Sequence, residues 1–142
     1  MAYKLFDEGE QHILDVYFRG ATPPAGFYFG LCNVVGGVAN MAETLTLATL
    51  TGEPLGNGYA RQLVERSAVG WPTLALDAGD YMATSSEESF VASGGSIGPV
   101  TVQFLATSSD NTGKLVAAVD LSASRTMATG ETLKVTQKVK LS

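Results

Sequence analysis

Residues 100–121 read Val-Thr-Val-Gln-Phe-Leu-Ala-Thr-Ser-Ser-Asp-Asn-Thr-Gly-Lys-Leu-Val-Ala-Ala-Val-Asp-Leu, and they carry the clearest structural signal in the chain. Val100, Val102 and Phe104 alternate with polar residues, as expected of a strand with one buried face. Asp-Asn-Thr-Gly at 110–113 is typical of a turn, and 115–121 form a second apolar run. The stretch therefore predicts an antiparallel hairpin in the last third of the chain.

The C-terminal stretch Leu-Lys-Val-Thr-Gln-Lys-Val-Lys-Leu at 133–141 alternates in the same way. Its apolar positions fall on one face, and its lysines, Lys134, Lys138 and Lys140, fall on the other. This period of two over nine residues predicts a single strand with one face in water. The three lysines account for most of the basic charge of residues 101–142, which carry a net charge of +2. We expect them to form a contact surface.

Shorter apolar runs precede these two stretches and are separated by turns rich in glycine, asparagine and proline. The run at 27–34 is apolar throughout, which predicts a strand covered on both faces, and 59–65 alternates like a partly buried strand. We expect edge strands at 81–84 and 88–92. Turns recur about every 8–12 residues, which is the signature of a sandwich or barrel. The predicted fold class is therefore all-β, a single β-sandwich or jelly-roll-like domain.

One helix is expected, near the start of the chain. Apolar residues at helical spacing, followed by Gly20 and two prolines, predict an amphipathic helix over about residues 7–19. Asp7 is the expected N-cap, with Glu10 completing a capping box. The expected apolar stripe consists of Ile13, Leu14, Tyr17 and Phe18. We accordingly divide the chain into an N-terminal helical segment, 1–20, and a β-sandwich domain, 21–142.

The composition supports this fold class and narrows the function. Of 142 residues, 45% are apolar and only 16% are charged, while 14 Thr and 11 Ser favour strands and turns over exposed helices. The net charge of −5 argues against nucleic acid as a partner, because phosphate binding needs a basic surface. No apolar run reaches the ~20 residues of a membrane span, and the N-terminus lacks a secretory-signal pattern. We expect neither nucleic acid nor membrane as a partner.

Side chains able to carry out catalysis are scarce. The chain has one histidine, His12, and one cysteine, Cys32, and each lies in a segment with an apolar pattern. A Cys/His nucleophile would require these two residues to meet, and a metal site built on His or Cys would need further ligands. We therefore expect no enzymatic activity, no cofactor and no metal site.

Three other residues are candidates for binding. Tyr59 and Arg61 would point the same way from one strand, and Tyr and Arg are favoured at interface hot spots. Trp71 precedes Pro72, which favours a sheet edge. The alternatives are a Tyr packed at a sheet edge beside a surface Arg, and a Trp in the core. A further hypothesis, a carbohydrate-binding sandwich, would use Trp71, Tyr59 and Tyr81 as stacking platforms.

Four local patterns occur together in the chain. They are Phe-Tyr-Phe-Gly-Leu at 27–31 after the helix, Gly-Asn-Gly-Tyr-Ala-Arg-Gln at 56–62, Trp71, and a Thr-Gly-Glu-Thr-Leu turn at 129–133. In their order and spacing the chain resembles small structural proteins of the tailed-bacteriophage virion, of the head-decoration, neck or tail-accessory kind. Residues 113–119, Gly-Lys-Leu-Val-Ala-Ala-Val, depart from that group, in which this segment is often rich in glycine and carries an aromatic.

The resemblance implies a role in assembly, and a place in the virion after synthesis in the host cytoplasm. The leading hypothesis is a capsid decoration protein, a homo-oligomer such as a trimer. It would clamp the major capsid protein or other virion proteins and dock through its N-terminal helix. The alternative in the same context is a neck or tail accessory protein.

Overall fold

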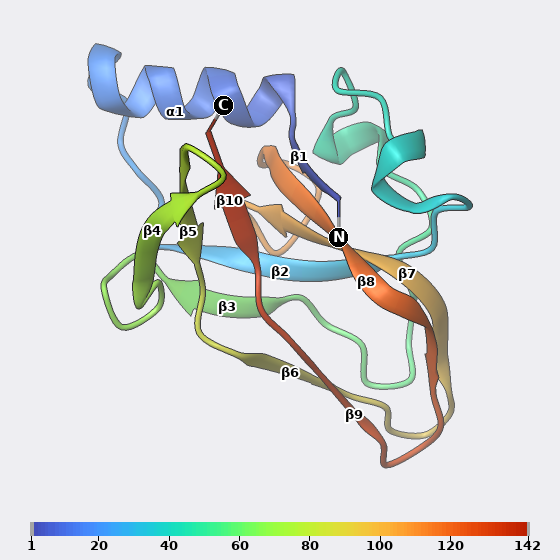
Figure 1. Ribbon diagram of the computed structural model, residues 1–142. Helices are drawn as coiled ribbons and strands as arrows, with labels where there is room; N and C mark the ends of the chain where they lie inside the picture. The colour runs from blue at the N-terminus through green and yellow to red at the C-terminus, as the bar shows by residue number, and fades with distance from the viewer. Residues whose placement is uncertain (1, 142) are drawn as a thin grey trace.

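A computed structural model describes residues 2–141 as two packed layers of antiparallel strands with one helix (Figure 1). The first layer is a five-stranded sheet in the order β1-β8-β7-β2-β3. Its strands are β1 (Tyr3–Leu5), β2 (Gly26–Cys32), β3 (Gln62–Glu65), β7 (Ile97–Ala106) and β8 (Leu115–Met127). The predicted fold class, an all-β sandwich with a short N-terminal helix, is confirmed.

The hairpin predicted from residues 100–121 is the centre of this layer. Strands β7 and β8 pair antiparallel with Phe104 opposite Ala118, and the turn predicted at 110–113 lies between them. Strand β2 pairs along the other side of β7, and β1 along the other side of β8. The backbone N–H and C=O groups of the two central strands are therefore paired on both sides. Buried backbone groups need such partners.

The second layer is a ribbon of five short strands divided into two sheets. One sheet has the order β10-β5-β4, and the other pairs β6 with β9. The bounds are β4 (Thr73–Asp77), β5 (Asp80–Thr84), β6 (Glu88–Val91), β9 (Thr132–Val135) and β10 (Lys138–Lys140). Strand β6 follows β5 and β10 follows β9, so the two sheets are successive parts of one antiparallel ribbon that crosses in front of β2 in Figure 1.

The single strand predicted for 133–141 is wrong, because the ribbon is interrupted at its middle. Thr136 and Gln137 separate β9 from β10. At this point the Ser85 N–H donates to the Gln137 carbonyl oxygen, but the Gln137 N–H donates to the Ser85 hydroxyl at 2.8 Å. A side chain thus replaces one backbone partner, and the regular ladder breaks. The alternation continues through the break, since Leu133, Val135 and Gln137 are all buried.

Two other predicted strands differ from the structure. The strand expected over 59–65 begins only at Gln62, so Tyr59 and Arg61 lie in the preceding loop. Strand β5 is central in its sheet, between β10 and β4, and is not the edge strand expected at 81–84. The edges of this sheet are β10 and β4, and the alternating residues 73–77 form β4 after Trp71.

The hydrophobic core has two parts, one on each face of the five-stranded sheet. The part between the layers includes Phe29, Phe90 and Leu105. The other includes Cys32, Leu47 and Phe104, and the segment 33–52 with its two 3-10 turns, Gly37–Asn40 and Leu47–Thr49, covers it. Strand β2 is therefore covered on both faces, as predicted from the apolar run at 27–34.

The helix α1 (Asp7–Arg19) matches its predicted range, but its start differs. Phe6 is the N-cap and no side chain caps the helix, so the predicted Asp7 capping box is wrong. The Glu8 carboxylate instead accepts hydrogen bonds from the Leu47 N–H at 3.0 Å and the Leu115 N–H at 2.7 Å. Glu8 therefore links the first turn of α1 by hydrogen bonds to the segment 33–52 and to β8.

Candidate interaction surface

The apolar stripe of α1 is left outside the core. Only Gly9 of the helix is buried, and a Cβ built on it would lie 2.3 Å from the Val116 carbonyl oxygen. Tyr17 and Phe18 are 80% and 74% exposed, and their rings touch edge to face with centroids 5.0 Å apart. The helix therefore contacts β8 closely at its first turn and presents its later apolar residues to solvent.

These exposed side chains form one wall of a groove. Leu14, Tyr17 and Phe18 line a hollow of about 470 Å³ together with Leu5 of β1 and Leu141 after β10. Figure 1 shows α1 lying across the end of the molecule where the C-terminus and the β4–β5 hairpin also lie. The hollow is almost wholly apolar, with Glu10 as its single charged residue.

A second hollow of about 220 Å³ continues the first toward the core. It lies between α1 and the strands, and Ile13 lines both hollows. Val139 of β10 lines the inner hollow and Leu141, two residues later, lines the outer one. The remaining lining residues of the inner hollow are His12, Phe27, Arg66, Trp71, Ala83, Leu105 and Val116. The two hollows therefore adjoin at Ile13 beneath α1, and we refer to them together as the groove.

The β4–β5 hairpin extends the opposite wall of this groove. Residues directly opposite each other in an antiparallel pair share a face. Leu74 is opposite Ala83, and Ala83 is opposite Val139, so Leu74 lies on the groove face. Leu76 is opposite Tyr81, whose carbonyl oxygen accepts the Leu141 N–H. Seven large apolar side chains on the two walls are each more than half exposed: Leu14, Tyr17, Phe18, Leu74, Leu76, Tyr81 and Leu141. We call them the α1–β4 surface.

One histidine, His12, lines the inner hollow. Burial lowers the pKa of His12 below its ordinary value of 6.5, Asp15 acts to raise it and Lys114 to lower it further. The imidazole is therefore held in its neutral form at neutral pH, which suits an apolar groove. The other candidate nucleophile, Cys32, lies buried on the far face of the sheet, and burial raises the pKa of its thiol to about 12.

Tyr59 and Arg61 are not on a strand, and their side chains are engaged within the chain. The Arg61 side chain is only 4% exposed and forms a bidentate ion pair with Glu53, with N–O distances of 2.8 and 2.9 Å. Its remaining donors reach the carbonyl oxygens of Ser108 and Asp110 and the side-chain oxygen of Asn111. All five guanidinium donors are thus used. We call Glu53, Tyr59, Arg61, Ser108, Asp110 and Asn111 the Arg61 cluster.

Tyr59 completes the Arg61 cluster. Its hydroxyl donates to Glu53 at 2.6 Å and accepts the Leu31 N–H at 2.9 Å, and its ring stacks on Phe90. Burial raises the pKa of Tyr59, and the adjacent Glu53 carboxylate raises it further. For Arg61, burial alone would lower the pKa, but the hydrogen bonds and charge of Glu53 outweigh it and raise the pKa. An interface role for Tyr59 and Arg61 stays a prediction.

Trp71 lies between the core and the groove. Its ring packs edge to face on Phe27 and Phe29, with centroids 6.1 and 6.3 Å away. It also lines the inner hollow, and its indole N–H has no hydrogen-bond partner among residues 2–141. Trp71 is therefore the only one of the six predicted interface residues that contacts the groove. Its role in binding stays a prediction.

The three lysines predicted to share one surface have different neighbours. Lys134 lies 3.9 Å from Glu87, and Lys138 lies over the Tyr3 ring. Lys140 forms ion pairs with Asp77 at 3.2 Å and Asp80 at 4.0 Å. Lys134 and Lys138 also line one pocket, and Lys138 and Lys140 line another. A role for the three lysines as a contact surface stays a prediction.

Sequence reasoning missed Leu74 and Leu76, which are among the most exposed large apolar residues of the chain. The signal was present: two leucines alternate with Thr73 and Ala75 between Pro72 and the tight turn at Ala78-Gly79. The alternation marks one apolar face of a strand, but it does not show whether another layer covers that face.

Comparison with known families decides the identity of the chain. Residues 5–140 match the family model described as podophage GP4 fiber I protein gp80. The chain belongs to this family. A gp80-family chain is a structural protein of the phage virion, so the resemblance to tailed-phage virion proteins is confirmed. A search of the curated proteins gave no match.

Two further findings concern the part of the gp80-family chain that the structure covers. Within residues 2–141, no three His, Cys, Asp or Glu side chains are grouped so that they could hold a metal ion. The single helix found there is too short and too polar to cross a membrane.

Proposed function

We propose that this chain is a non-enzymatic structural subunit of a phage fiber or tail-accessory assembly, and that it self-associates through the α1–β4 surface. The observation that carries the proposal is an apolar groove whose two walls remain uncovered. One wall is α1, near the start of the sequence, and the other combines the β4–β5 hairpin, near its middle, with Leu141. The match to a fiber protein family supports the location. The groove supports the mode of assembly.

The size of the uncovered surface favours a second copy of the chain as its occupant. An aromatic side chain presents roughly 150–250 Å², so seven large side chains, each more than half exposed, leave on the order of 800 Å² uncovered. The largest apolar patch on a typical monomer is only about 300–600 Å². A standard interface buries about 800 Å² on each partner. One copy of this surface is therefore enough for a specific contact.

The two walls of the groove also suggest the symmetry. One wall is a helix face and the other is a sheet face, so they are not equivalent. If α1 of one copy covers the sheet wall of the next, the contact is heterologous. Such contacts form rings when the rotation between copies closes and open filaments when it does not, and we propose a closed ring such as a trimer. This agrees with the homo-oligomer expected from the sequence. Other virion proteins would then contact the remaining surface of the ring.

The capsid decoration hypothesis differs from the fiber proposal in copy number and place. A decoration protein covers the head in many copies, whereas a fiber or tail-accessory protein is present in a few copies at one vertex. Cryo-EM of the virion, together with quantitative mass spectrometry of its proteins, separates the two. We expect density for this fold at the tail only. Density spread over the head would overturn the fiber proposal.

The same particles test the role of the groove. Phage carrying the Tyr17→Ser and Phe18→Ser substitutions should lose the subunit, because both rings are exposed in the single chain and buried in the proposed contact. The matched control replaces Val35 and Leu55, which are exposed but lie outside the α1–β4 surface, with serine. Control particles should keep the normal number of copies. Equal incorporation of both variants would contradict self-association through the groove.

A further inference from the structure

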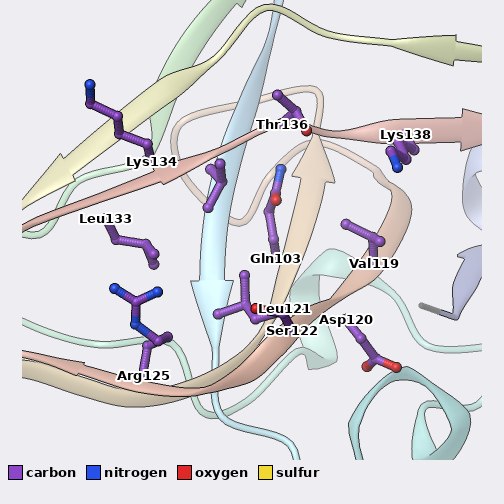
Figure 2. A pocket seen from close by; sticks show the side chains of 11 residues that line it. Gln103, Val119, Asp120, Leu121, Ser122, Arg125, Leu133, Lys134, Thr136 and Lys138 are labelled. Atoms are coloured by element: carbon purple, nitrogen blue, oxygen red, sulfur yellow. The ribbon is translucent and has the colours of Figure 1, made fainter.

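A second, polar pocket lies on a different part of the molecule from the α1–β4 surface. It is a hollow of about 200 Å³ between β7, β8 and the chain from β9 to the start of β10. Figure 2 shows Gln103 in the middle of the lining side chains, with Arg125 and Lys134 on one side and Lys138 on the other. The assembly role proposed above uses none of these residues.

Gln103 is an unusual residue for the centre of a sandwich. It is only 1% exposed, and its side-chain Nε2 has no hydrogen-bond partner among residues 2–141. Its neighbours across the sheet are Leu31 and Val119, both buried and apolar. A buried donor without an acceptor destabilises a protein, so leucine would suit this position better unless the amide has a partner. The side chain lines the pocket, and a rotation of its amide group would bring this donor to a bound acceptor.

The charged groups around the pocket are also mostly donors. No carboxylate within residues 2–141 lies within ion-pair distance of Arg125 or Lys138, and Lys134 has only Glu87 at 3.9 Å. The single lining carboxylate, Asp120, accepts the Val38 N–H at 2.7 Å. The pocket therefore carries two more positive than negative charges, in a chain whose net charge is −5.

We propose that this pocket binds an oxyanion, the carboxylate or phosphate group of a small ligand. Three of the four charged residues that line the pocket are cations, and the Gln103 Nε2 lacks an acceptor. A ligand that supplies acceptors and negative charge therefore fits the pocket. The Gln103 amide would donate to one oxygen, and Arg125 and Lys134 would balance the charge. The hydroxyl groups of Ser122 and Thr136 and the apolar side chain of Leu121 line the rest of the pocket, which suits an acidic sugar.

Nuclear magnetic resonance on the full chain tests the proposal directly, because the side-chain amide of Gln103 gives its own signals. Three probes are titrated: inorganic phosphate, glucuronate and glucose. We expect phosphate and glucuronate to shift the Gln103 amide signals with saturation, and glucose to leave them in place. A glucuronate affinity above that of phosphate would assign the site to acidic sugars. No saturable shift with either anion, or an equal shift with glucose, would overturn the proposal.

Variants separate a built site from a general effect of charge. Arg125→Ala with Lys134→Ala should weaken anion binding at least tenfold. The control, Arg19→Ala with Lys114→Ala, removes the same charge from exposed positions outside the pocket and should leave the affinity unchanged. Gln103→Leu should abolish the tight binding while the chain stays folded, which a thermal melt verifies. Equal loss in the control pair, or full binding by Gln103→Leu, would contradict the assignment.

Discussion

The Arg61 cluster and the α1–β4 surface differ from the usual distribution of residues, in which charged side chains are exposed and apolar side chains are buried. The first is charged and polar, yet the Arg61 side chain is almost completely buried and all its donors are used. The second is built from leucines and aromatics, yet its side chains are mostly exposed. The chain thus covers its polar cluster with its own loops and leaves an apolar surface uncovered.

The comparison shows that partners, and not polarity alone, decide which residues a chain buries. A guanidinium can leave water when a carboxylate and several carbonyl oxygens replace its hydration. An apolar side chain stays outside when the core has no room for it. Here the close contact of Gly9 with Val116 holds α1 at the end of the sandwich, where no layer covers its later turns.

The largest effect is expected from breaking the Arg61 cluster. Arg61→Ala leaves the Glu53 carboxylate, which is only 21% exposed, without its ion-pair partner, and should lower the free energy of unfolding by about 3 kcal/mol. Urea denaturation measures the loss. The control Arg19→Ala removes an exposed ion pair with Asp15 and should change stability by less than about 0.5 kcal/mol. Similar losses in both variants would mean that the cluster is not a stabilising centre.

The next effect concerns the single buried residue of α1. Gly9→Ala improves helix propensity but places a Cβ 2.3 Å from the Val116 carbonyl oxygen, so the helix must move away from β8. We expect a net loss of about 2 kcal/mol. The neighbouring Glu10→Ala, at an exposed position, should have a much smaller effect. Thermal unfolding of the two variants gives the comparison, and a stabilised Gly9→Ala would show that α1 does not depend on this contact.

A smaller effect is expected in the hairpin that carries the sheet wall of the groove. Ala78 has a positive φ of 52° in the tight turn before Gly79, a conformation that Asn adopts more readily. Ala78→Asn should raise the free energy of unfolding by about 0.5 kcal/mol. Ala123→Asn, on an exposed part of β8 without positive φ, should not stabilise the chain. Hydrogen exchange in β4 and β5 should slow only in the first variant.

The smallest effect is a dependence on pH that comes from His12. Burial lowers its pKa in the folded chain, so the unfolded chain takes up a proton more readily as the pH falls through 6.5. The contribution of His12 to stability is therefore complete above that pH and declines below it. Self-association that covers the groove should make stability depend more strongly on pH, because it would bury His12 further. Between pH 7.5 and 5.5, the free energy of unfolding and the extent of association should fall less in His12→Gln than in the wild type. An equal fall in both chains would mean that other groups cause the pH dependence.

Much of the fold could be predicted from the sequence because local patterns determine it. The hairpin of β7 and β8, the strand β2 and the range of α1 all follow from periodicity and turn residues. The break at Thr136 and Gln137 could not be predicted, since it depends on a hydroxyl group, Ser85, that is distant in the sequence. Alternation alone does not reveal which strand lies opposite.

The candidate site was less predictable, because the alternation of residues shows that a face is apolar but not what covers it. The stripe of α1 and the alternation at 73–77 are visible in the sequence, but their exposure follows from how the layers end. Likewise, Tyr59 and Arg61 are residue types common at interfaces, and only the fold brings Glu53 and the loop at 108–111 around them.

The most direct test of self-association through the α1–β4 surface is the mass of the purified chain in solution, measured by sedimentation velocity over a range of concentrations. We expect the wild type to sediment as a closed oligomer of the 14.8 kDa chain. Tyr17→Ser with Phe18→Ser should sediment as a single chain with unchanged circular dichroism, while Val35→Ser with Leu55→Ser keeps the wild-type mass. A monomeric wild type, or an oligomer that survives the Tyr17 and Phe18 substitutions, would contradict the account.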